Sequence, residues 1–119
     1  MKAMSCNIIN SNMETYLGVK RISFLMPESG SLKDKRQITR KLRDTIKSRF
    51  NVSFSEIDVN DKWQRATIAV SIVSCQEETI RSTFLQISNL VETCIGVRII
   101  NEVNDVFRYE DEINDDWMS

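Results

Sequence analysis

Residues 16–50 read YLGVKRISFLMPESGSLKDKRQITRKLRDTIKSRF, and the spacing of the apolar side chains changes within this stretch. In its first part, Ile22, Phe24 and Met26 fall on one face of an extended chain, while Arg21 falls on the other. A period of two residues is typical of a half-buried strand. The PESG sequence that follows predicts a turn that ends this strand.

The second part of the stretch has the spacing of a helix. Ser31 is followed three residues later by Asp34, and this pair supplies a cap oxygen and an acidic first turn. A helix is therefore predicted from Ser31 to about residue 50. Its apolar residues recur at helical spacing and predict one buried stripe, made of Leu32, Ile38, Leu42, Ile46 and Phe50.

The rest of the chain repeats this change of period. Residues 52–59 and 65–75 are predicted strands, and the short loop between them predicts a hairpin. A capping-box pair that begins at Ser74 predicts the start of a second helix, and Gly96 is placed to end it. Residues 97–108 carry the signal of a last strand.

The element order predicts an α+β fold of the ferredoxin-like type, βαββαβ. Right-handed crossovers then give a four-stranded antiparallel sheet with two helices on one face. The length of 119 residues suits a single domain. This domain is predicted over residues 15–109, between a flexible N-terminal extension at 1–14 and an acidic tail at 110–119.

The second face of the sheet is predicted to be open, and small side chains line it. RNA-recognition motifs of similar fold stack bases on aromatic residues of that face, a mode that small side chains do not support. A second copy of the chain could approach such a face closely. The alternative hypothesis is therefore a homo-oligomeric interaction module, such as a homodimer, with no nucleic-acid ligand. The small residues are Ser53, Ser55, Thr67, Ala69 and Ser71.

Composition excludes several function classes. A hydrophobic share of 41% and a net charge of -1 exclude a wholly disordered chain. The chain has no His, which removes Ser-His and Cys-His nucleophile pairs. Glu56 and Asp58 could form an acid–base pair, but no nucleophile or cofactor loop accompanies them, so a non-catalytic protein without a cofactor is predicted.

The cysteines and the chain ends indicate the cellular setting. Cys6, Cys75 and Cys94 are widely spaced and form no Cys-x-x-Cys pair, which predicts free thiols and no metal site. No apolar run is long enough to cross a membrane, and the N-terminus lacks the apolar run of a signal peptide. A cytoplasmic protein without a membrane partner is therefore predicted.

The first predicted helix is strongly basic. Residues 33–49 include eight basic and two acidic residues, a net charge of +6. Five of the basic residues are spaced 3, 4, 3, 4, which confines them to an arc of roughly 80° on a helix. We call these five residues the basic stripe, and we predict that the stripe contacts phosphates of RNA or of the ribosome. Its members are Lys33, Arg36, Arg40, Arg43 and Lys47.

Two other interpretations of the basic stripe stay open. The stripe could be an ordinary solvated helix face, although such a face normally interleaves acids with bases. The stripe could also pair, within one chain or between chains, with the acidic C-terminal end, which could then compete with RNA for the helix. Residues 98–119 hold two basic and seven acidic residues, the acids being Glu102, Asp105, Glu110, Asp111, Glu112, Asp115 and Asp116.

The predicted hairpin loop has two interpretations. In the structural one, Trp63 packs over the hairpin end while Asp58 and Arg65 pair across it. In the functional one, Trp63 stacks on a nucleobase and Arg65 binds phosphate. The structural interpretation is favoured because a hairpin anchor needs no ligand.

Four stretches resemble the YlxP-like family of small bacterial proteins, a domain of unknown function (DUF503): PESGSLKDKR at 27–36, FNVS at 50–53, EID at 56–58 and WQRAT at 63–67. The resemblance covers residues 16–107 and implies a ferredoxin-like fold. Genes of this family tend to lie beside those of translation-initiation and ribosome-maturation factors, so it also implies a role linked to RNA or the ribosome. The chain departs from the family pattern in its two extensions and at Lys20, where relatives tend to be apolar.

Overall fold

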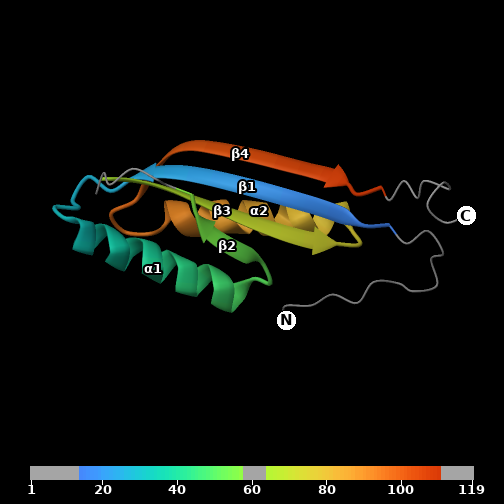
Figure 1. Cartoon of the computed structure of the whole chain (residues 1–119), viewed down its shortest axis with the longest axis horizontal. Coiled ribbons are helices and arrows are strands. Elements are labelled where there is room, and N and C mark those ends of the chain that lie inside the picture. Colours follow the sequence, from blue (N-terminus) through green and yellow to red (C-terminus); the bar gives the residue numbers. More distant parts are fainter. Residues whose placement is uncertain (1–13, 58–63, 111–119) are drawn as a thin grey trace, which may run out of the picture.

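The computed structural model describes residues 14–57 and 64–110, and Figure 1 shows the whole chain. Within the described residues, the elements follow the predicted βαββαβ order. They are β1 (Tyr16–Leu25), α1 (Leu32–Arg49), β2 (Ser53–Glu56), β3 (Arg65–Ser74), α2 (Glu77–Glu92) and β4 (Arg98–Arg108).

The four strands form one antiparallel sheet in the order β2-β3-β1-β4. Helix α1 lies against β2 and β3, and α2 lies against β1, β3 and β4. Both helices therefore cover one face of the sheet, as Figure 1 shows, and no described helix covers the other, which we call the open face. The predicted ferredoxin-like fold is confirmed. None of the helices among the described residues is long and apolar enough to cross a membrane.

The core lies between the sheet and the helices. Alternate residues of β1 and β3 point into it, and α1 and α2 each contribute one stripe. Gly18 marks a close approach between β1 and α2, because an added Cβ would press against Ile80 and would lie 2.9 Å from a Phe84 ring carbon. The buried apolar residues are Ile22, Phe24, Met26, Leu42, Ile46, Ala66, Ile68, Val70, Ile80, Phe84, Ile87 and Val91.

The start of α2 differs from the prediction. Its N-cap residue is Gln76, whose side chain makes no capping hydrogen bond within the described residues. The Ser74 hydroxyl instead accepts the Gln76 backbone N–H at 3.1 Å, because Ser74 is the last residue of β3 and turns the chain toward the helix. The predicted capping box at Ser74 is therefore wrong. Gly96, at φ 83°, lies in the turn beyond the helix C-cap residue Thr93.

The prediction of three free thiols is wrong for Cys75. Cys75 is disulfide-bonded, whereas the half-buried Cys94 is a free cysteine. Cysteine spacing alone does not reveal pairing, because pairing depends on which parts of the chain the fold brings together. Cys6 lies outside the described residues.

Candidate nucleic-acid interface

The start of α1 sets the phase of the basic stripe. The Ser31 hydroxyl accepts the Asp34 backbone N–H at 3.2 Å, and the Asp34 carboxylate accepts the Gly30 backbone N–H at 3.0 Å. This reciprocal pairing satisfies two donors at the helix start and fixes where the helix begins. The predicted cap at Ser31 is confirmed, and α1 ends at Arg49, close to the predicted residue 50.

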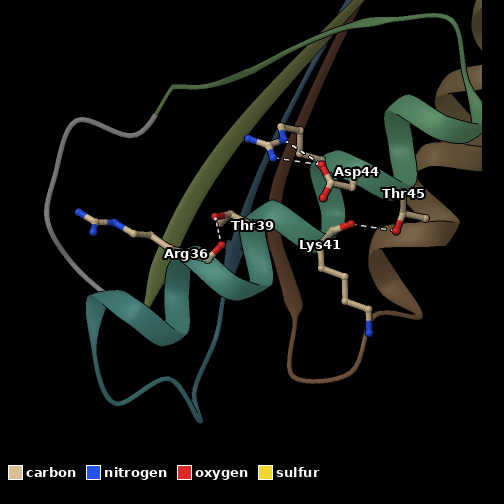
Figure 2. Close-up of polar contacts among 6 residues, drawn as sticks. Arg36, Thr39, Lys41, Asp44 and Thr45 are labelled. Atoms are coloured by element: carbon tan, nitrogen blue, oxygen red, sulfur yellow. Dashed lines mark hydrogen bonds and ion pairs between the residues drawn. The ribbon is translucent and has the colours of Figure 1, made fainter.

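Four side chains of α1 are buried against the sheet: Lys35, Thr39, Leu42 and Ile46. Leu42 and Ile46 belong to the predicted apolar stripe, and Ile38 packs beside them. The Thr39 hydroxyl donates to the backbone carbonyl of Arg36 at 3.3 Å, so the helix itself satisfies this buried group (Figure 2). Lys35 is only 8% exposed, so one of the eight basic residues is withdrawn from any polyanion.

All five residues of the basic stripe are exposed. Within the part of the chain that the structure describes, only Arg43 of the five forms an ion pair. Its Nε and Nη2 atoms both donate to one Asp44 carboxylate oxygen at 3.1 Å. Both side chains are well exposed, so this pair contributes little to stability and leaves Arg43 able to exchange partners. In Figure 2 the Arg36 side chain extends away from the helix.

The other exposed cations of α1 lie elsewhere. Figure 2 shows the Lys41 side chain leaving the helix in a different direction from that of Arg36. Arg49 lines a groove of about 1010 Å³ that lies between the end of α1, the end of β3 and α2. The structure therefore separates the five residues of the stripe from the remaining basic residues of the same helix.

Arg65 is not part of the basic stripe. It is the first residue of β3, is exposed, and pairs with Leu25 on the face of the sheet that the helices leave open. Trp63 and Asp58 lie outside the described residues, so the stacking of Trp63 and the pairing of Asp58 with Arg65 stay predictions.

The described acids of the C-terminal end do not pair with α1. Strand β4 is the edge strand on the β1 side of the sheet, whereas α1 lies against β2 and β3. The Glu102 carboxylate lies 3.1 Å from the Lys20 ammonium, and the Glu110 carboxylate lies 4.0 Å from Arg108. Residues 111–119 of the predicted acidic tail lie outside the described residues.

The burial of Lys20 was not predicted from the sequence. Lys20 is 2% exposed, and its ammonium donates to the Asn104 side-chain oxygen at 2.8 Å and lies 5.9 Å from the centre of the Phe84 ring. The Ser88 hydroxyl donates to Glu102 at 2.5 Å. This hydrogen bond, helped by Lys20, lowers the pKa of Glu102 even though partial burial opposes it.

Fold and surface together define a class of protein, a ferredoxin-like α+β domain that displays a basic helix. Residues 17–103 match the sequence model of a family described as "Protein of unknown function (DUF503)", and the chain belongs to that family. The predicted resemblance is thereby confirmed.

A relative in Bacillus subtilis (strain 168), described as "Uncharacterized protein YlxP", is 34% identical over 58 residues. That match spans 49% of this chain and 63% of the length of the relative.

Two solved structures have a similar backbone arrangement. The de novo designed protein Foldit4 is 14% identical, with a TM-score of 0.47, over 82% of this chain and 99% of its own. A mutant of SnoaB, a cofactor-independent oxygenase from Streptomyces nogalater, is 10% identical, with a TM-score of 0.41, over 83% of this chain and 96% of its own. At such low scores neither likeness supports a conclusion about fold or activity.

Proposed function

We propose that this protein is a non-catalytic RNA-binding protein, and that it contacts phosphates of free or ribosomal RNA through the basic stripe. One observation carries the proposal: five cations are exposed on one side of α1, and only one of them has an acidic partner among the described residues. Like charges at these spacings each cost a few tenths of a kcal/mol, so helix stability does not explain the stripe. A bound polyanion would offset this repulsion.

The stripe suits backbone contact better than base recognition. From Lys33 to Lys47 it extends about 21 Å along the helix axis, at about 1.5 Å per residue. Arg and Lys side chains on such a line can follow successive phosphates, which position a protein on RNA but carry no sequence information. The proposal therefore concerns RNA in general and names no particular sequence.

Changing Arg36, Arg40 and Arg43 together to Glu tests the proposal. We expect this triple variant to lose co-sedimentation with ribosomal particles, because three attractive contacts with phosphate become repulsive. All three side chains are exposed, so the fold should be retained, and circular dichroism would check this.

A matched control changes three exposed cations outside the stripe, Lys41, Arg49 and Arg81, to Glu. Its change in net charge equals that of the triple variant, so it separates a local contact from a general electrostatic effect. We expect the control to keep most of the binding. Co-sedimentation that survives in the stripe variant, or that both variants lose equally, would contradict the proposal.

A further inference from the structure

The open face of the sheet carries a cluster of apolar side chains. In antiparallel pairing, residues directly opposite each other point to the same face. Leu17 lies opposite Val73 on β3 and opposite Phe107 on β4. Val19 is the next residue of β1 on this face, and its partner on β4 is Asp105. Val103 lies two positions before Asp105 in β4 and therefore also belongs to this face. We call these five residues, Leu17, Val19, Val73, Val103 and Phe107, the apolar patch.

The apolar patch contributes nothing to the core of the domain. Val73 is 65% exposed, and the exposed fractions of Val19, Val103 and Phe107 are 40%, 44% and 41%. These residues come from three adjacent strands and therefore form a contiguous surface. A contiguous exposed apolar surface with a polar rim is typical of a protein–protein contact site.

Two opposite charges accompany the apolar patch. Asp105 lies opposite Val19, and Arg21 lies opposite Val103, so both side chains belong to the same face. Both are exposed, and neither forms an ion pair with any residue that the structure describes. The patch thus has one cation and one anion in neighbouring positions, each available to a partner.

We propose that the open face is the interface of a symmetric homodimer. A two-fold axis through the apolar patch would bring the two patches together and place Arg21 of one protomer against the partner's Asp105, and the reverse. Such an interface uses the same surface twice, so the surface must be complementary to itself. One apolar cluster with one cation and one anion meets that requirement, whereas a polyanion would leave both the apolar residues and Asp105 without favourable contacts.

Small side chains beside the apolar patch permit close packing. Ala69 and Ser71 of β3 share the open face, so the backbones of two sheets can approach to the usual distance of about 10 Å. Helix α1 lies on the covered face, so both basic stripes of such a dimer stay exposed. The dimer therefore does not depend on the proposed RNA contact.

A charge placed in the apolar patch tests the dimer. We expect sedimentation equilibrium to show the wild-type protein as a dimer, and Val73→Glu to raise the dimer Kd at least about tenfold, because a glutamate would be buried without a partner. Leu85→Glu is the matched control, since Leu85 on α2 is 64% exposed and Val73 is 65% exposed. The control should dimerise as the wild type does.

Charge reversal gives a second, independent test. Arg21→Glu and Asp105→Arg should each raise the dimer Kd, and the two changes combined should bring it back to within about threefold of the wild-type value. This test does not rely on Val73→Glu folding correctly. A monomeric wild type, a Leu85→Glu variant as weakened as Val73→Glu, or a combined variant that stays monomeric would overturn the proposal. The proposal would also be overturned by variants of the apolar patch that change RNA binding but leave the oligomeric mass in solution unchanged.

Discussion

At the scale of single residues, Lys20 shows how this fold accommodates a charge in its core. Lys20 belongs to the face of β1 that also carries Ile22 and Phe24. Its aliphatic stem packs in the core, and its ammonium reaches Asn104 and Glu102 on the neighbouring edge strand. The side chain therefore ties β1 to β4, where an apolar residue would contribute packing alone.

A double-mutant cycle on this pair would measure the tie. We expect Glu102→Ala to lower the free energy of unfolding by about 1–2 kcal/mol, because the buried ammonium loses its counter-charge. This figure is below that of a fully buried pair, since the Glu102 side chain is 34% exposed. Lys20→Met combined with Glu102→Ala should recover most of the loss, and urea unfolding would measure both. If the single and double variants lost the same free energy of unfolding, the stability of the buried Lys20 would not depend on Glu102.

The same carboxylate predicts a pH dependence of stability. The Ser88 hydrogen bond, followed by Lys20, holds the pKa of Glu102 below its ordinary value of 4.5. A carboxylate with a lowered pKa in the folded state adds stability above the unfolded-state pKa, and loses it as the pH falls through the folded-state pKa. We therefore expect stability to decline below about pH 4.5 and to decline less in Glu102→Gln. Thermal unfolding across this range would check it, and identical pH profiles would contradict it.

Single residues also mark the limits of prediction from sequence. The strand alternation that places Ile22 and Phe24 in the core also assigns Lys20 to it, so this burial could have been found. The partners of Lys20 could not, because Asn104 is brought opposite it only by the pairing of β1 with β4. The capping box predicted at Ser74 was wrong for another reason: the Ser74 hydroxyl accepts a hydrogen bond in the turn before α2 and does not cap the helix.

At the scale of elements, the position of α1 could be predicted from the sequence, whereas the role of its basic stripe can be tested only by binding experiments. Its ends were predicted correctly because the Ser31 cap and the apolar spacing agree on where the helix lies. The same spacing places Lys35 on the buried side of the helix, outside the arc of the basic stripe. The stripe therefore follows from helix geometry, and binding measurements in solution test whether it contacts RNA.

The salt dependence of RNA binding would count the phosphate contacts of α1. Each contact that is removed should reduce the slope of log K against log salt by about 0.7–0.9. We expect Arg40→Ala to reduce the slope by the amount that corresponds to one phosphate contact. Arg65→Ala should leave the slope unchanged, because Arg65 lies on the face of the sheet opposite to the one that α1 covers. Fluorescence anisotropy at several salt concentrations would measure the slopes. A reduced slope for Arg65→Ala would favour the functional interpretation of the hairpin.

At the scale of the whole molecule, the layer arrangement was predictable and the character of the open face was not. Right-handed crossovers leave only one face of the sheet for both helices, as the structure confirms. Small residues of β2 and β3 do lie on the open face, but Val73 and Phe107 come to flank Leu17 of β1 only through strand pairing. A register shift in β4, at Ile100, also interrupts the alternation from which its faces could be read in the sequence.

The charges of the whole chain lead to a last prediction. The net charge of -1 averages a helix region of +6 with an acidic C-terminal end. Tyr109 donates its backbone N–H to Thr15 at 2.8 Å, at the end of the sheet where Ser74 and the last residues of α1 share a groove. Residues 110–119 could extend about 33–36 Å, whereas three strand spacings cover only about 14 Å, so this segment can reach α1.

Deleting residues 110–119 should therefore strengthen RNA binding at low salt, because acids that compete with phosphate for the basic stripe are removed. The gain should shrink at high salt, where charges more than a few ångströms apart are screened. Anisotropy titrations of the full and shortened chains would measure it. Replacing the acids with Asn and Gln at constant length should reproduce the gain, since charge and not bulk is the cause. Unchanged affinity at low salt in both variants would mean that the acidic end does not act on α1.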